Sequence, residues 1–419
     1  MNKTRITIVI FYLLQIFLTF KGVGNSNKYI APILLFTASL AIPLIFLYLV
    51  LKKQLDSDVE ESKTKGENAF VAAFIGVFSI FLAYEELRKM FVKYANYASF
   101  SDVVPQINAL YFRWKAGENP YYELPEFPWH PFPVYMPLHW LPLKITDMLN
   151  CDTRWAGYVV LMLVAGIFAY LMAEHNKNKY TLWLAIILPS AALWGYIIWG
   201  EIDIPVSYEL NIAAYYLLLA GALATRNFYW TLIGLICCLL SRYTMVFWMP
   251  LLGFIFLKEY PLKKSMLFLS IVVASVVLLY IVPFISKDPS ILSKGLHYHN
   301  LAAIGDWSDN PWTAEKGVSF VIYMKEHFAG NWEQKVFTSR IVQATLMLSL
   351  LFLGLFLYFR RWAGQINPYD FLLAMLHITV LFFYNFGPLT YRYYLISMMM
   401  LSAVICCRVL ALHFEKKIT

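Results

Sequence analysis

Long apolar stretches joined by short polar connections make up most of this chain. Many of them run for roughly 20 residues, the length that a helix needs to cross the hydrocarbon core of a bilayer. They lack the alternation of apolar and polar positions that marks membrane strands, and only helices or closed barrels satisfy their backbone in lipid. The pattern therefore predicts an all-α, polytopic membrane helix bundle. We expect twelve spans, near residues 6–21, 29–51, 69–88, 153–173, 180–199, 207–224, 228–241, 243–257, 265–285, 341–359, 369–387 and 393–412.

Two long polar interruptions break this pattern, at about residues 89–152 and 286–340. A shorter one at residues 52–68 (KKQLDSDVEESKTKGEN) is rich in charge and predicts a solvated linker. We divide the chain there into an N-terminal two-span hairpin with its linker, residues 1–68, and a larger transmembrane domain, residues 69–419. The first apolar run lacks a small-residue cleavage site, so we expect it to be retained as a signal anchor.

Composition and charge orient this bundle in the membrane. Of the 419 residues, 60% are hydrophobic and only 14% are charged, which excludes an ordinary soluble protein. The formal net charge of +8 is spread over the loops, so it predicts topology rather than nucleic-acid binding. Most lysines and arginines of the short loops lie on the side of the two termini. We therefore expect cytoplasmic termini and place the two long loops outside. The five cysteines predict no disulfide framework.

The first long loop contains the most distinctive stretch, residues 99–142 (SFSDVVPQINALYFRWKAGENPYYELPEFPWHPFPVYMPLHWLP). It predicts a helix over residues 101–116 with Ser101 as N-cap, ended by Gly117 and the Asn-Pro pair that follows. Its many aromatic residues suit a helix lying at the lipid interface. The run from Pro125 to Pro142 has too many prolines for a regular helix and predicts an irregular return to the membrane.

The order of these features resembles the first extracytoplasmic loop of the GT-C glycosyltransferases, in particular the bacterial polyprenyl-phosphate-mannose-dependent mannosyltransferase-like family. The shared features are an acid before a helix, a G-x-N-P-Y turn and a return rich in proline and aromatic residues. Further points of resemblance are LWGYIIWGEIDIP, FYWTLIGLICCLLSRYTMVFWMPLL, HYHNLAAIGDWSDNPW and FGPLTYRYY, so that it extends over residues 69–412. The N-terminal hairpin departs from the family pattern, in which the acidic loop follows the first span.

The resemblance implies an inverting glycosyltransferase. Such an enzyme moves a sugar, mannose or another hexose or pentose, from a polyprenyl-phosphate donor to a lipid-linked or cell-envelope glycan acceptor. It works at the outer face of a membrane, here the bacterial cytoplasmic membrane. Asp102 stands at the position of the base that takes the proton of the acceptor hydroxyl. The alternative is that Asp102 only stabilises the N-terminus of the following helix, worth roughly 0.3–1 kcal/mol.

The departing phosphate requires cations, and two arginines stand alone at outer helix junctions among aromatic residues. These are Arg242 in SRYT and Arg392 in TYRYY, with the hydroxyl of Tyr391 as a further donor. His297 and His299 in the second long loop are alternative phosphate ligands. An arginine at the membrane interface can instead be an anchor whose charge reaches back to water.

Other residues suggest an acceptor or secondary site. Glu201 and Asp203 form an acidic outer turn, whereas Tyr121, Tyr122 and His130 offer aromatic faces to a sugar ring. The H-x-H pair of the second loop resembles half of a metal site, but such pairs are commoner as surface or hydrogen-bonding histidines. The first loop reads SDVV without a D-x-D pair, so we expect no metal and no cofactor, although the pattern does not exclude a divalent cation.

A secondary transporter or a flippase for lipid-linked glycans is the alternative function. Twelve spans suit such a protein, but it would be expected to carry ionisable residues deep in its spans and an internal repeat. The charges of this sequence lie near the ends of the spans, and the two halves show no repeat. The sequence contains no nucleotide-binding glycine loop, so a soluble nucleotide sugar is not expected as the direct donor.

Overall fold

The computed structural model describes residues 3–22, 28–52, 66–175, 179–200, 202–308 and 318–415. Over these ranges the regular secondary structure is helical and contains no strand, in agreement with the predicted all-α class. Most of the predicted charged linker, residues 52–68, lies outside the described residues.

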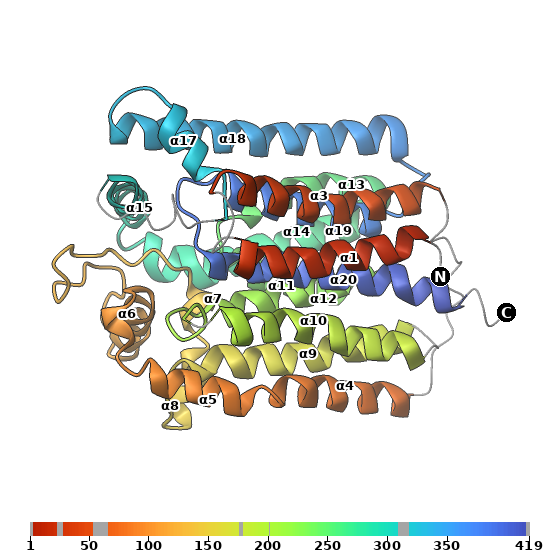
Figure 1. Ribbon diagram of the computed structural model, residues 1–419, viewed down its shortest axis with the longest axis horizontal. Helices are drawn as coiled ribbons and strands as arrows, with labels where there is room; N and C mark the ends of the chain where they lie inside the picture. Colours follow the sequence, from red (N-terminus) through yellow and green to blue (C-terminus); the bar gives the residue numbers. More distant parts are fainter. Residues whose placement is uncertain are drawn as a thin grey trace.

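The long helices of the described chain run roughly along one common axis and form the body of the molecule (Figure 1). Each predicted span overlaps one of these helices. They are α1 (Lys3–Phe17), α3 (Ile30–Leu51), α4 (Gly66–Phe81), α9 (Trp155–His175), α10 (Lys179–Trp199), α11 (Glu209–Ala224), α12 (Phe228–Leu239), α13 (Met245–Glu259), α14 (Leu262–Val276), α18 (Trp332–Leu357), α19 (Pro368–Asn385) and α20 (Leu395–Glu415).

Seven helical segments of the described chain are long and apolar enough to cross a membrane. Three further apolar helical segments, which lie within α10, α11 and α12, are shorter, at 10 to 17 residues each. The chain is therefore a helical membrane protein by the length and composition of its helices. The π-helical segments η1 (Leu18–Gly22), η3 (Val277–Ile285) and η4 (Tyr358–Trp362) extend α1, α14 and α18.

The core of the bundle surrounds α11, whose sixteen residues are all buried. It packs against α9, α12 and α20, and lies in the middle of the bundle (Figure 1). A helix that is apolar on all sides must be enclosed by other helices, which explains its weak amphipathic pattern. The segments built on α14 and α18 are only 22% buried and expose apolar side chains, as expected of helices that face lipid.

The N-terminal hairpin of α1 and α3 packs into this core, against α10, α19 and α20. The Tyr12 hydroxyl donates a hydrogen bond of 2.5 Å to the Leu188 carbonyl, and the Cys406 thiol lies 3.7 Å from the Ile8 carbonyl. Tyr12 and Ile8 are fully buried. The hairpin therefore shares the hydrophobic core of the bundle. All five cysteines are free thiols, as predicted.

The remaining helices gather at one end of the bundle, opposite the end where α1 begins and α20 finishes (Figure 1). They come from the two long loops, which are predicted on the same side because an even number of predicted spans separates them. They are α5 (Tyr84–Lys93), which continues α4 toward this end, α6 (Val103–Lys115), α7 (Pro137–Trp140), α8 (Leu143–Met148), α15 (Ile291–Ser308) and α17 (Val321–His327).

The second loop is shorter than the predicted range 286–340, because α18 begins at Trp332 and not near residue 341. A capping box starts this helix: the Asn331 side chain accepts from the Gln334 amide, and the Gln334 side chain accepts from the Asn331 amide. Hydropathy alone missed this start, since the first turns of α18 carry polar residues. Arg340 therefore belongs to a long helix and not to a loop.

Candidate functional site

A cavity of about 1510 Å³ lies at the loop end of the bundle. The first loop with α6, the helix α15 and the ends of α13, α18 and α19 that lie nearest these loops all contribute to its walls. Aromatic side chains line much of it. Its charged and titratable lining residues, tyrosines aside, are Asp102, Asp203, Arg242, His299, Asp306, Arg340 and Arg392.

Asp102 occupies the N-cap position of α6, but its side chain makes no capping hydrogen bond. Its Oδ2 accepts instead from Trp129 Nε1 at 3.0 Å and from the Tyr298 hydroxyl at 2.9 Å. Trp129 belongs to the proline-rich part of the first loop and Tyr298 to α15. Both long loops therefore meet at this carboxylate, and Oδ1 receives no hydrogen bond from the part of the chain that the structure describes.

The helix α6 starts slightly later than predicted and ends where expected. The Ser101 hydroxyl accepts from the Val103 amide at 3.2 Å, but Asp102 and not Ser101 stands at the N-cap position. Gly117 adopts a φ of +80°, and the Glu118 amide donates to the Arg113 carbonyl at 2.9 Å. This Schellman-type end requires a left-handed residue, which explains the glycine.

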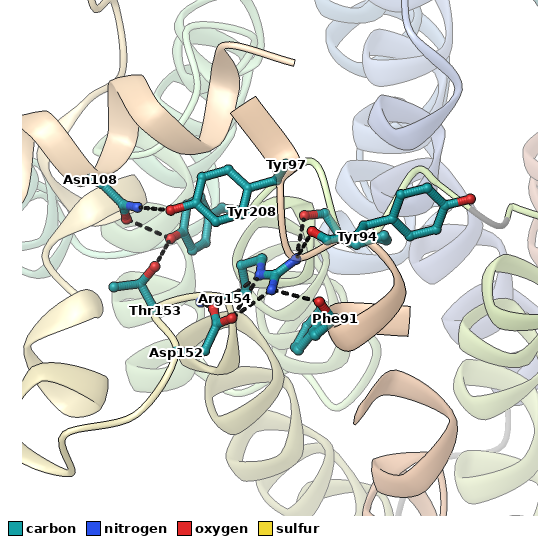
Figure 2. A network of polar contacts seen from close by, with 9 residues as sticks. Phe91, Tyr94, Tyr97, Asn108, Asp152, Thr153, Arg154 and Tyr208 are labelled. Atoms are coloured by element: carbon teal, nitrogen blue, oxygen red, sulfur yellow. Dashed lines mark hydrogen bonds and ion pairs between the residues drawn. The ribbon is translucent and has the colours of Figure 1, made fainter. Parts of the chain in front are cut away.

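A polar network holds α6 against the bundle, as Figure 2 shows. The Tyr208 hydroxyl, just before α11, donates to Asn108 Oδ1 of α6 at 2.8 Å and lies 2.6 Å from the Thr153 hydroxyl. Asn108 Nδ2 in turn donates to the Tyr97 hydroxyl at 3.2 Å. Buried polar groups that satisfy one another in this way fix the relative position of the elements that carry them. The helix that follows Asp102 is thereby anchored to the starts of α9 and α11.

Arg154 extends the network toward α5 (Figure 2). Its guanidinium is buried, forms a bidentate ion pair with Asp152 and donates to the carbonyl oxygens of Phe91 and Tyr94. Its charge is thus matched by one carboxylate, and most of its N–H groups have acceptors. Such an arrangement suits a structural arginine that joins the loop to the bundle.

The two arginines predicted to bind phosphate line the cavity, and each is already paired with an acid. Arg242 forms an ion pair with Glu209, at the start of α11, and its guanidinium lies 4.6 Å from the centre of the Tyr394 ring. Arg392, in η5 (Arg392–Tyr394), places Nε 3.3 Å from Asp203 Oδ2. Burial raises the pKa of Asp203 to about 6, and Arg392 opposes that shift. Asp203 thus forms an ion pair with Arg392, which the sequence predicted as a phosphate ligand.

Arg340 is a third arginine of this cavity. Its Nε donates to Asn300 Oδ1 at 3.0 Å, and its Nη2 lies 2.8 Å from His299 Nδ1. Burial and the charge of Arg340 lower the pKa of His299 to about 4, so the imidazole is neutral and accepts through Nδ1. Within the described ranges, no carboxylate lies within ion-pair distance of Arg340.

The other predicted site residues divide into two groups. Tyr121 and Tyr391 line the cavity; the Tyr121 hydroxyl donates to the Tyr135 carbonyl at 2.9 Å, and Tyr391 stacks on Tyr393. The members of the second group are exposed and do not line it: Tyr122, His130 and His297. Glu201 lies outside the described residues.

The H-x-H pair falls on α15, where residues two apart point to different faces of the helix. Accordingly, His299 contacts Arg340 in the cavity, whereas His297 is exposed. Among the residues described, no three histidine, cysteine, aspartate or glutamate side chains converge as they would around a metal ion.

Sequence reasoning missed four residues of the site: Trp129, Glu209, Tyr298 and Arg340. Two of them carried a usable signal. Glu209 opens an otherwise apolar helix, and an acid at the edge of a buried span is expected to have a cationic partner. Arg340 follows the N-x-x-Q capping pattern that starts α18, which makes it a cation near the first turns of a long helix.

The fold and the site define a helical membrane protein with a largely aromatic cavity that contains several charged side chains, where its two long loops meet. Comparisons of this chain with family models, with curated proteins and with solved structures find no match.

Proposed function

We propose that this protein is an inverting glycosyltransferase of the GT-C type. It moves a sugar, mannose or another hexose or pentose, from a polyprenyl-phosphate donor to a lipid-linked or cell-envelope glycan acceptor. The observation that carries the proposal is the environment of Asp102. One oxygen of this carboxylate accepts hydrogen bonds from Trp129 and Tyr298, and its side chain lines a large cavity that also contains arginines.

In the proposed reaction, Oδ1 of Asp102 takes the proton of the acceptor hydroxyl. The acceptor oxygen forms a bond to the anomeric carbon as the bond from that carbon to the donor phosphate oxygen breaks. The bonding electrons leave with the phosphate, and a single displacement inverts the anomeric configuration. The two hydrogen bonds to Oδ2 support this role, because they hold the carboxylate in one orientation and leave the other oxygen for the substrate.

The phosphate that leaves gains charge and has to meet a cation in the same cavity. Arg242, Arg392, Tyr391 and His299 all line the cavity that contains Asp102, which supports the sequence-based assignment. Because Glu209 and Asp203 already pair with these arginines, a phosphate would share each guanidinium with a carboxylate. His297 is exposed and away from the cavity, so we leave it out of the proposed phosphate site.

The proposed membrane arrangement has twelve spans, cytoplasmic termini and the cavity at the outer face of the bacterial cytoplasmic membrane. The convergence of both long loops at one end of the bundle supports it (Figure 1). A lipid-linked donor and acceptor then reach the cavity at the level of the lipid headgroups. We propose that no metal or other cofactor takes part, because the first loop lacks a D-x-D pair beside Asp102.

Transfer by the purified protein from a panel of polyprenyl-phosphate sugars, with and without a chelator, tests this proposal. Asp102→Asn keeps the size of the side chain and should lower turnover by about 10²–10⁴, the usual contribution of a general base. Glu85→Gln is a control for the loss of a carboxylate, because Glu85 pairs with Arg88 on the exposed surface of α5 and does not line the cavity. Full activity of Asp102→Asn would remove Asp102 as the base, and no transfer from any donor would contradict the function.

A secondary transporter or flippase is the second candidate. It is favoured by an ionic cluster at the opposite end of α19, where Asp370 pairs with Arg226 at 3.0 Å and with Arg408 at 3.2 Å. Asp370 and Arg408 are buried within helices, where ionisable residues often mark a transport path. Movement of a labelled polyprenyl-linked glycan across proteoliposomes, without transfer of its sugar, would favour this candidate.

A further inference from the structure

The three arginines of the cavity differ in how their charge is balanced. Arg242 pairs with Glu209, and Arg392 pairs with Asp203. The contacts of Arg340 are the amide oxygen of Asn300 and a ring nitrogen of His299, which are both uncharged acceptors. In the described part of the chain, Arg340 is therefore the cavity arginine whose positive charge lacks a paired carboxylate.

The contacts of Arg340 also orient its guanidinium. Nε and Nη2 are used by the two residues of α15, whereas Nη1 makes no hydrogen bond to any residue that the structure describes. Nη1 of Arg340 is not fully buried, and the Arg340 side chain lines the cavity. One edge of the planar group is thus fixed by the protein, and the other edge is open to a ligand. Two parallel N–H donors are the geometry that recognises a phosphate or carboxylate.

An interfacial anchor would look different. An arginine that only reaches for water extends its side chain along the helix toward the headgroups and exposes the charge. Arg340 is instead half-buried and turned toward α15, which partly removes its charge from water without supplying an anion. A partly desolvated cation of this kind gains much more from an anionic ligand than a cation that already has a carboxylate partner.

We propose that Arg340, held in place by His299 and Asn300, is the principal contact for the phosphate group of a lipid-linked substrate in this cavity. This inference rests on the proposed function and changes its assignment of the phosphate site. Arg242 and Arg392 are then positioning residues that join α12, α11 and the last outer turn through their ion pairs. His299 is also a positioning residue, since its neutral ring accepts from Arg340 and leaves the charge for the ligand.

The experiment measures the affinity of the full-length protein, in lipid nanodiscs, for a polyprenyl monophosphate and separately for inorganic phosphate. Arg340→Gln should weaken binding of the polyprenyl monophosphate roughly 10- to 100-fold, the range expected when hydrogen bonds to a charged group are lost. Arg340→Lys should recover only part of the loss, because a point charge lacks the fork geometry. Arg113→Gln is the matched control, since Arg113 bonds with backbone carbonyls of the first loop and does not line the cavity.

The outcomes separate this inference from the proposed function. Binding that depends on Arg340, without transfer from any donor, would support the inference and contradict the glycosyltransferase. If the wild-type protein transfers the sugar and Arg340→Gln binds the polyprenyl monophosphate within about twofold of the wild-type affinity, the inference is overturned but the proposed function stands. Equal affinity for inorganic phosphate and the polyprenyl monophosphate would overturn the lipid source of the phosphate. His299→Gln is added to the series, and the melting temperature of every variant is measured so that a loss of binding caused by misfolding is recognised. A variant that melts like wild type and binds more weakly supports the assignment.

Discussion

At the scale of single residues, the pairing of charges changes what a substitution is expected to do. Arg242 and Glu209 are both largely buried, with side chains 14% and 4% exposed. A buried ion pair adds little net stability, but removing one partner leaves an uncompensated charge in a poor solvent. The position of Arg242 in the sequence suggested a ligand whose loss affects turnover alone. Its contact with Glu209 adds a structural cost to the same substitution.

We therefore expect Arg242→Gln to destabilise the protein by about 3–5 kcal/mol, because Glu209 remains buried without a counterion. The double variant Glu209→Gln with Arg242→Gln should recover most of that loss. Chemical denaturation of the three variants in detergent measures it. A stable Arg242→Gln protein with low turnover would contradict this account and return Arg242 to the phosphate site.

Two titratable residues of the cavity should make stability depend on pH in opposite directions. Burial, with Arg340 and Arg242, lowers the pKa of His299 from 6.5 to about 4. The unfolded chain therefore binds more protons between these values, and this term raises stability as pH rises. Burial raises the pKa of Asp203 from 3.8 to about 6, against the effect of Arg392, so the folded protein binds more protons and stability falls as pH rises.

The two trends should largely cancel between pH 4 and 6 in the wild-type protein, since their pKa ranges overlap. His299→Gln leaves the Asp203 trend, and we expect its stability to fall as pH rises. Asp203→Asn leaves the opposite trend, and its stability should rise by up to about 1.4 kcal/mol per pH unit. Unfolding free energies measured against pH test this, and parallel profiles for the two variants would contradict it.

At the scale of elements, polar contacts fix the position of α6 in addition to its apolar face, which belongs to a buried hydrophobic cluster. Its buried face includes Val104, Ile107 and Leu110, and the Asn108–Tyr208–Thr153 network fixes it relative to α9 and α11 (Figure 2). Because Asp102 immediately precedes this helix, a shift of α6 moves the carboxylate. Small displacements of a catalytic group can cost large factors in rate.

Tyr208→Phe tests this coupling, because it removes the hydroxyl that joins Asn108 to Thr153 and keeps the buried ring. We expect a loss of stability of about 1–3 kcal/mol, since two polar groups lose a partner. Hydrogen exchange of residues 103–115 should accelerate more than that of α11, and turnover should fall although Tyr208 does not line the cavity. Tyr122→Phe is the control, because its hydroxyl bonds only weakly with Glu118 at the surface, at 3.3 Å. Unchanged exchange in α6 would show that apolar packing alone holds the helix.

At the scale of the whole molecule, the two ends of the bundle differ in chemistry. The loop end holds the cavity with its acids, arginines and tyrosines, whereas the opposite end carries the cluster of Asp370, Arg226 and Arg408. The proposed orientation puts the cavity outside the cell, because the short loops at the opposite end carry most of the lysines and arginines.

Native Cys151 reports on this orientation. It is exposed between α8 and α9 at the loop end, whereas the other four cysteines lie within α12 and α20. An impermeant thiol reagent should label the wild-type protein in intact cells, and Cys151→Ser should abolish the labelling. A cysteine at Ser57 in the Cys151→Ser background should react only after the membrane is opened. The reverse pattern would put the cavity in the cytosol and contradict an outward-facing transferase.

The sequence by itself determined the helices and the grouping of the loops. Apolar stretches of sufficient length predict spans wherever they occur, and two loops separated by an even number of spans lie at one end. Local signals such as Gly117 also placed the end of α6, because a left-handed turn is encoded within a few residues. The capping pattern at Asn331 was equally local, but the predicted span boundary followed hydropathy and so missed the start of α18.

The tertiary structure alone decided which charges meet. Arg242 and Glu209 are 33 positions apart, Arg340 and His299 are 41 apart, and Arg392 and Asp203 are 189 apart. Such pairs arise from the packing of distant helices, and hydrophobic periodicity carries no information about them because many packings bury the same apolar faces. The sequence therefore pointed to acids and arginines at the outer ends of the spans. Only the folded bundle separated the arginines that have a carboxylate partner from Arg340, which has neutral ones.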